Sequence, residues 1–121
     1  YTSNSIGSGL ENTDLIIAAY EGEDYAAHYC KNLISTNGTD DWYLPNRLEL
    51  TYMSANLYDN VSADFNTASD AFYWSSYEKV ENAPNPITNN YAYIIQFNGS
   101  MSYINTRQRD LFYHVRAARR F

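Results

Sequence analysis

The sequence holds few of the side chains that enzymes use for acid–base, nucleophilic or metal chemistry. It contains two histidines, His28 and His114, and one cysteine, Cys30. These residues lack the ligand spacing of a zinc site and do not define a Ser-His-Asp triad. We expect His28 to be a partly exposed helix residue and His114 to be a strand residue. We expect Cys30 to be a buried small hydrophobe, with no internal disulfide, and the domain to use no metal or other cofactor.

Carboxylates are the remaining candidates for chemistry, and they gather at residues 21–24 and at Asp40 and Asp41. Neither cluster has the spacing of an EF-hand loop, which favours solvated acids over a calcium site. Asp40 with Glu49 could form the carboxylate pair of a glycan hydrolase, which we keep as a minor alternative. Gly7-Ser8-Gly9 opens no βαβ unit and predicts no nucleotide site. We therefore expect a protein that is not an enzyme.

The charge is unevenly distributed along the chain. The net charge of −6 disfavours a general nucleic-acid binder. Residues 1–106 hold 13 acidic and 3 basic residues, whereas residues 107–121 hold five arginines and one aspartate. The basic end either pairs with the acidic body or belongs to an anion-binding face, and the sequence leaves both open.

The amino-acid composition favours a protein whose function is to bind a partner. The sequence contains 13 tyrosines, 14 asparagines and 11 serines, which are residue types that antibody loops use to bind. A small core cannot use so many tyrosines, because each buried hydroxyl needs a partner. Some of these rings are therefore expected on the surface.

The length of 121 residues fits one domain spanning residues 1–121. No apolar run approaches the roughly 20 residues of a membrane helix, so we expect no membrane insertion. Because the sequence begins with Tyr1, we expect a processed product or a part of a longer chain.

Three helices are predicted in the first half of the chain, after an initial strand or loop at residues 1–9. Asn12 or Thr13 is expected to cap the first helix, which ends at Gly22. Asp24 is expected to cap the second, which runs to about Ser35 before Asn37-Gly38. The pattern Asn46-x-x-Glu49 resembles a capping box and predicts the start of the third.

Strands are predicted in the second half, at 72–77, 91–97, 101–105 and 113–117. Asn98-Gly99 is a strong hairpin signal between the second and third of these. The order of these elements, helices first and strands second, indicates an α+β domain with helices packed on an antiparallel sheet. The loops 58–70 and 78–90 are long for this size, which favours a functional role.

A set of short motifs, taken in order, resembles one family. The motifs are Asn12-Thr13, Tyr25-Ala26-Ala27 with Cys30, Asp41-Trp42-Tyr43-Leu44-Pro45, Glu49-Leu50, Tyr73-Trp74-Ser75-Ser76, Phe97-Asn98-Gly99 and Val115-Arg116-Ala117-Ala118-Arg119. Over roughly residues 6–121 they resemble domains like the C-terminal domain of the Legionella collagen-like adhesin. Within this pattern we interpret Trp42, Pro45, Trp74 and Arg116 as scaffold residues.

The resemblance implies a C-type-lectin-like fold and a binding role. Similar domains occur in adhesins, surface lipoproteins and phage tail-fibre tips, several of them displayed as trimers. The Glu-Pro-Asn and Trp-Asn-Asp signatures of calcium-dependent lectins are missing, so calcium-dependent sugar binding is not expected. The implied fold also occurs in oxidases of the formylglycine-generating type, which rely on a pair of cysteines. The single Cys30 does not match that pair.

We therefore expect a non-enzymatic recognition domain on a cell or virion surface or outside the cell. It would bind a cell-surface glycan or protein, as a homo-oligomer, most simply a trimer. The candidate contact residues are Tyr58, Asn60, Phe65, Tyr77, Asn85, Asn89, Asn90, Tyr91, Tyr103 and Arg107. The alternative is a structural module that assembles or caps a fibre, filament or envelope complex.

Overall fold

A computed structural model describes residues 2–22, 25–57, 71–78, 91–96, 103–108 and 113–119, with the backbone alone for residues 78, 91 and 103–108. Within these residues, helices come first along the chain and strands follow, which confirms the α+β class. The elements are α1 (Gly9–Ala19), α2 (Ala26–Asn32), α3 (Arg47–Leu57), β1 (Phe72–Glu78), β2 (Tyr91–Gln96) and β3 (Tyr103–Gln108).

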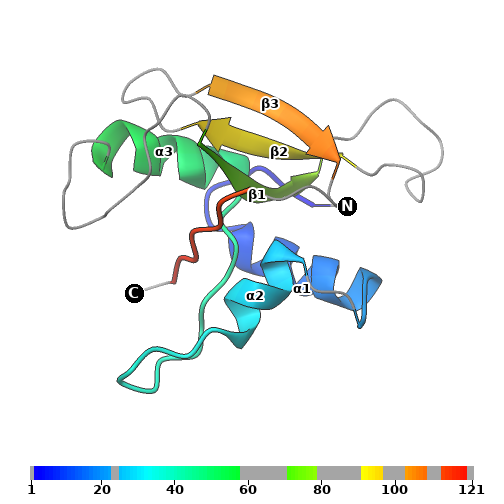
Figure 1. Ribbon diagram of the computed structural model, residues 1–121, viewed down its shortest axis with the longest axis vertical. Coiled ribbons are helices and arrows are strands. Elements are labelled where there is room, and N and C mark those ends of the chain that lie inside the picture. Colours follow the sequence, from blue (N-terminus) through cyan, green and yellow to red (C-terminus); the bar gives the residue numbers. More distant parts are fainter. Residues whose placement is uncertain are drawn as a thin grey trace.

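The three strands form an antiparallel sheet in the order β1-β2-β3. Because successive strand residues point to opposite faces, Tyr73 and Trp74 pack in different clusters. Tyr73 lies with Ile95 and with Leu50 of α3 on one face. Trp74 belongs to the cluster on the other face, toward α1 and α2. Figure 1 shows α3 alongside the sheet, and α1 and α2 on the side of β1 away from β2.

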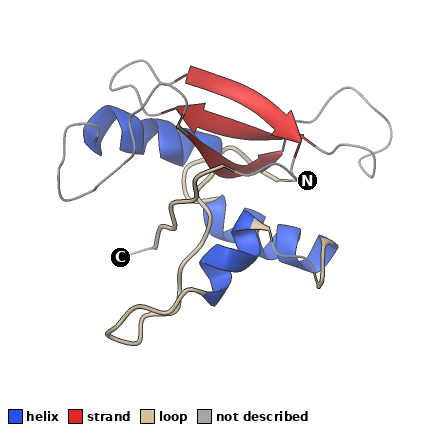
Figure 2. Cartoon of the chain, viewed as in Figure 1, coloured by secondary structure: helices blue, strands red, loops and turns tan. Residues whose placement is uncertain are grey.

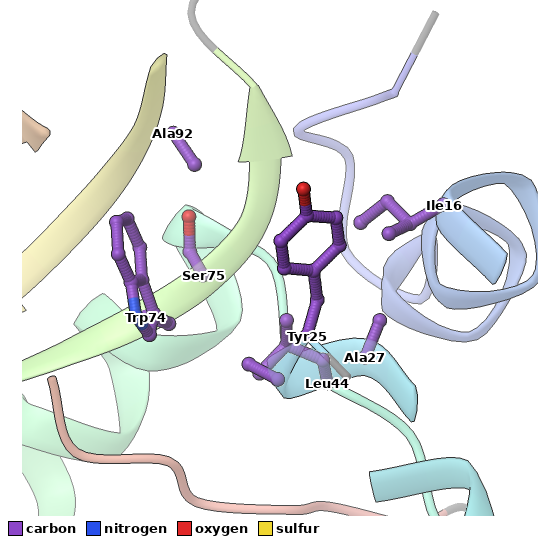
Figure 3. A pocket seen from close by; sticks show the side chains of 8 residues that line it. Ile16, Tyr25, Ala27, Leu44, Trp74, Ser75 and Ala92 are labelled. Atoms are coloured by element: carbon purple, nitrogen blue, oxygen red, sulfur yellow. The ribbon is translucent and has the colours of Figure 1, made fainter. Parts of the chain in front are cut away.

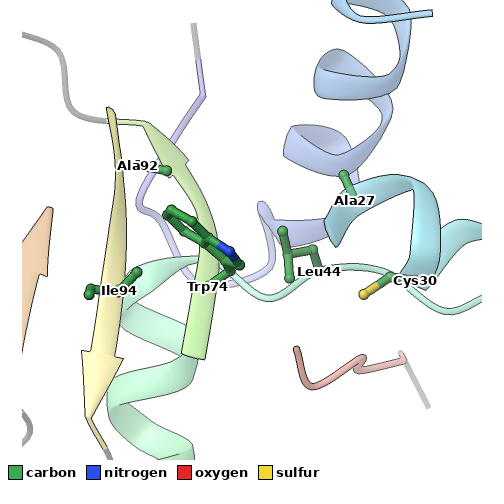
Figure 4. Packing of buried hydrophobic residues seen from close by; sticks show 6 residues of the cluster. All are labelled: Ala27, Cys30, Leu44, Trp74, Ala92 and Ile94. Atoms are coloured by element: carbon green, nitrogen blue, oxygen red, sulfur yellow. The ribbon is translucent and has the colours of Figure 1, made fainter. Parts of the chain in front are cut away.

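The larger core cluster joins the helical layer to the sheet. Its buried members are Ala27, Cys30, Leu44, Trp74, Ala92 and Ile94 (Figure 4). The Trp74 ring also meets Tyr113 edge to face, with ring centres 5.1 Å apart. Cys30 is fully buried, as expected, and burial raises the pKa of its thiol to about 12.

The first helix begins earlier than its sequence indicated. The prediction that Asn12 or Thr13 caps it was wrong, because α1 begins at Gly9 and both residues lie inside it. Their side chains are buried and bind distant backbone instead. Thr13 Oγ1 accepts a hydrogen bond from Leu44 N (2.9 Å), and Asn12 Oδ1 accepts one from Ser3 N (2.8 Å). These polar groups therefore fix tertiary structure rather than a helix end.

The second helix is shorter than predicted. It ends at Asn32, because Leu33 is already extended, and the N-cap residue is Tyr25. Asp24, the expected cap, lies outside the described residues. The segment between α2 and α3 instead projects from the helices (Figure 2). There the indole N–H of Trp42 donates to Ser35 Oγ and to the Thr39 carbonyl, which holds the projecting turn closed.

The predicted capping box of the third helix is confirmed. Asn46 Oδ1 accepts from Glu49 N, and Glu49 Oε2 accepts from Asn46 N, both at 2.9 Å. The other oxygen of Glu49 accepts from Gly7 N (2.8 Å) and Gly9 N (3.3 Å). Gly9 lies so close that an added Cβ would collide with the Glu49 carboxylate and the Tyr43 ring. Glu49 thereby joins the starts of α1 and α3.

Two strand predictions need correction. The returning strand is Tyr103–Gln108 rather than 101–105, and Asn98-Gly99 lies outside the described residues. Residues 113–117 alternate but form no strand. His114 makes one bridge to Tyr73, and Ala118 makes another to Tyr43. The segment that contains His114 and Ala118 runs from the sheet to Tyr43. Its two bridges therefore go to different neighbours, and no continuous strand pairing forms. Residues 2–8 form a loop.

Candidate functional site

The structure describes only part of the predicted contact set. Tyr58, Asn60, Phe65, Asn85, Asn89 and Asn90 lie outside the described residues. Tyr91, Tyr103 and Arg107 are placed by their backbone alone, and Tyr77 is described in full. The prediction for the first six therefore stays a prediction.

Strand register separates the four placed residues into two groups. Tyr91 pairs with Gln108, and Arg107 pairs with Ala92. Glu78, the residue after Tyr77, also pairs with Ala92. Tyr77, Tyr91 and Arg107 therefore share one end of the sheet. Tyr103 pairs with Gln96 at the opposite end, so the structure does not bring it to the other three.

An irregularity in β1 places Tyr77 next to Tyr93. From Trp74 to Glu78 the chain advances four residues in β1, while the paired residues Ile94 and Ala92 are two apart in β2. Such a bulge turns the following side chain toward a new neighbour. Here the rings of Tyr77 and Tyr93 stack, with centres 5.2 Å apart and planes within 10° of parallel.

Two serines stabilise this irregular stretch. Ser75 Oγ accepts a hydrogen bond from Tyr77 N (3.2 Å). Ser76 N donates to the Pro45 carbonyl (2.8 Å), and Ser76 Oγ accepts from Asn12 Nδ2 (3.3 Å). Both serines are buried. The Tyr-Trp-Ser-Ser motif thus supplies local and tertiary bonds at the bulge that positions Tyr77.

Arg47 lies over both stacked rings. Its guanidinium carbon is 4.9 Å from the centre of the Tyr93 ring and 5.7 Å from that of Tyr77. Arg47 is the first residue of α3, and the buried Leu50 and Ser54 follow at the i+3 and i+7 positions on the same stripe. The helix therefore directs Arg47 toward the sheet. We call Arg47, Tyr77 and Tyr93 the Arg47 platform.

The platform combines partial exposure with a cation that pairs with no carboxylate among the residues that the structure describes. All three residues are half-buried. Within the described part of the chain, no hydrogen bond or ion pair engages the Arg47 guanidinium, and its contacts are the two rings. Glu49, two residues along α3, instead accepts bonds from backbone N–H groups. A guanidinium stacked on a ring keeps its in-plane N–H donors available.

A small cavity lies between the helices α1 and α2 and the strands β1 and β2. Its volume is about 40 Å³, enough for a few waters or a small apolar group. Figure 3 shows Ile16 and Tyr25 on one side of it and Trp74 on the other. The described lining is mostly apolar and contains Ile16, Tyr25, Ala26, Ala27, Leu44, Trp74, Ser75 and Ala92. Within that lining no group of titratable side chains converges, as acid–base chemistry would require.

The proposed scaffold residues occupy structural positions. Pro45 and Trp74 are buried, Trp42 donates the two hydrogen bonds described above, and Arg116 is half-buried. In the basic terminal segment, Arg119 pairs with Asp41 at 3.0 Å. This ion pair is one instance of the basic end contacting the acidic body. Among described residues, no cluster of three or more His, Cys, Asp and Glu side chains forms, and no helix is long and apolar enough to cross a membrane.

Sequence reasoning missed two of the three platform residues. Tyr93 lies in a predicted strand but is not among the predicted contacts, and Arg47 is not among them either. The spacing of Arg47 from Leu50 was the available signal, because it places the arginine on the buried stripe of the helix. No local signal indicated that Tyr77 and Tyr93 would meet.

Comparison with family models, curated proteins and solved structures found no match for this chain.

Proposed function

We propose that this chain is a non-enzymatic recognition domain that binds a cell-surface protein or glycan. Its contact surface is the end of the sheet where Tyr77, Tyr91 and Arg107 lie, together with the Arg47 platform. The loops predicted at 58–70 and 78–90 would contribute the contacts predicted at Tyr58, Asn60, Phe65, Asn85, Asn89 and Asn90. The wider proposal includes a C-type-lectin-like fold, display on a cell or virion surface and trimeric assembly, which the motif resemblance and the α+β architecture support.

One observation carries the proposal, namely the half-exposed stack of Tyr77, Tyr93 and Arg47. Tyrosine and arginine are among the residues that contribute most to binding energy at interfaces. Two strands and a helix hold the stack, so it is formed before any ligand arrives. Contacts held on regular elements lose less conformational entropy on binding than contacts on mobile loops.

The test begins with the purified chain on a glycan array and on intact bacterial and animal cells, with and without EDTA. We expect calcium-independent binding to a defined glycan or cell type. Tyr77→Ala and Tyr93→Ala should each weaken that binding at least tenfold, since buried interface tyrosines are worth about 2 kcal/mol or more. Their far-ultraviolet circular dichroism should match that of the wild type.

Tyr52→Ala is the matched control, because it also removes a tyrosine, but one that is 56% exposed on α3. Its binding should equal that of the wild type. If the two platform variants bind as well as the Tyr52 variant, the contact surface is misplaced and the proposal fails.

A second candidate is a structural assembly module, in which the same residue types contact other subunits. It is favoured by five large apolar side chains that are roughly half or more exposed, namely Ile6, Leu15, Tyr29, Ile34 and Tyr52. Sedimentation equilibrium separates the two. A stable oligomer that binds no cell or glycan supports assembly, and specific binding supports recognition.

A further inference from the structure

The Arg47 platform presents a cation that the described part of the chain does not neutralise. Lys31 and Arg119 each have a carboxylate partner, Asp14 and Asp41 respectively. Arg47 differs from both, because its side-chain contacts among the described residues are two aromatic rings. A half-buried guanidinium gains from an anionic partner more than an exposed one does, because solvent screens it less.

The geometry of the platform selects the shape of that anion. The guanidinium carbon lies 4.9 Å from the centre of the Tyr93 ring and 5.7 Å from that of Tyr77. The N–H donors of a guanidinium lie in its plane, where two parallel hydrogen bonds fit the two oxygens of a carboxylate. The backbone N–H groups at the start of α3 do not compete for this role. Leu48 N donates to Asn4, and Glu49 N donates to Asn46.

From this geometry we infer that the Arg47 platform binds a carboxylate carried by an acidic segment of a partner protein. The inference rests on the proposed recognition function and names the ligand group that the site takes. The carboxylate would bond to the Arg47 N–H edge, and a neighbouring apolar side chain of the partner would contact the tyrosine rings.

Two observations favour a protein over a sugar as the source of the carboxylate. A ring that stacks on a sugar needs a free face, and the stacking of Tyr77 on Tyr93 together with the Arg47 contact reduces the ring area available for a sugar. The net charge of the chain is −6, which opposes a densely charged polyanion at long range. A peptide with one or two acids beside an apolar residue meets less of this repulsion.

The experiment uses an array of 12-residue peptides that place Asp or Glu beside Phe, Tyr or Leu. Each peptide has a matched version with Asn or Gln in place of the acid. We expect the chain to bind a subset of the acidic peptides and not their amide versions. In isotope-labelled protein, the side-chain N–H signal of Arg47 should shift on titration with a bound peptide.

Variants then assign the binding to the platform. Arg47→Gln should weaken peptide binding about 10- to 100-fold, the range for losing a charge-assisted bidentate pair. Arg47→Lys keeps the charge but not the planar fork, so it should also bind poorly. Lys31→Gln is the control, because it removes an exposed cation of α2, and it should bind as the wild type does.

Three outcomes would overturn the inference. The first is equal binding of acidic peptides and their amide versions. The second is a preference for uronic-acid or sulfated oligosaccharides over all peptides, which would place the anion on a glycan. The third is Arg47→Gln binding as well as Lys31→Gln. If Tyr77→Ala abolishes cell binding while Arg47→Gln does not, the recognition proposal survives and only the carboxylate assignment fails.

Discussion

At the scale of single residues, the polar side chains at α1 and α3 act over long sequence distances. Thr13 and Asn12 are fully or almost fully buried, and each bonds to backbone outside its own helix. A buried polar group without such a partner would cost about 1–3 kcal/mol, so these residues specify where α1 lies. Cys30 differs from these polar residues, because its buried, uncharged side chain fills space in the apolar core.

Cys30 makes stability depend on pH in the alkaline range. Burial raises the pKa of the folded thiol from 9.0 to about 12. Between these values the unfolded thiol ionises and the folded thiol does not. The stabilising contribution is therefore complete below pH 9 and is lost as the pH rises toward 12. The loss is at most about 1.4 kcal/mol per pH unit.

Urea unfolding at several pH values between 8 and 11 measures this effect. Because the tyrosines also ionise there, Cys30→Ala is the reference. The unfolding free energy of the wild type should fall more steeply with pH than that of Cys30→Ala. Parallel curves for the two proteins would show that the thiol ionises equally well in the folded state.

At the scale of elements, Glu49 connects the starts of two helices. Its carboxylate accepts hydrogen bonds from Gly7, Gly9 and Asn46 backbone N–H groups. Glu49→Gln keeps the shape but removes the charge and places an amide donor among donors. We expect a loss of about 1–3 kcal/mol in unfolding free energy. Glu11→Gln, at an exposed acid in the first turn of α1, should change it by less than about 0.5 kcal/mol. Equal urea midpoints for the two variants would contradict the role of Glu49.

Features that depend on residues close together in the sequence were predictable, whereas contacts between distant segments were not. The capping box needs only Asn46 and Glu49, and β2 follows from a short apolar run after Asn90. By contrast, the Leu44 backbone that bonds to Thr13 lies 31 residues along the chain. The alternation at 113–117 does not reveal that His114 pairs with Tyr73 while Ala118, just beyond it, pairs with Tyr43. The Tyr77–Tyr93 contact depends on a bulge that no spacing in either strand encodes.

At the scale of the whole molecule, Trp74 joins the helical layer to the sheet. It packs in the cluster that contains Ala27 of α2 and Ile94 of β2. Cores of this kind unfold as one unit in small domains. We expect urea unfolding curves from tryptophan fluorescence and from far-ultraviolet circular dichroism to share one midpoint. Two separated midpoints would indicate that the helices and the sheet are independent units.

We propose that ligand binds where the sheet end meets the start of α3. The most direct test is amide hydrogen exchange of the chain, free and bound to the ligand that the cell and glycan screens identify. We expect slower exchange on binding at residues 47–50, 75–78 and 91–94. Slower exchange confined to α1 and α2, with the Arg47 platform unchanged, would contradict this proposal.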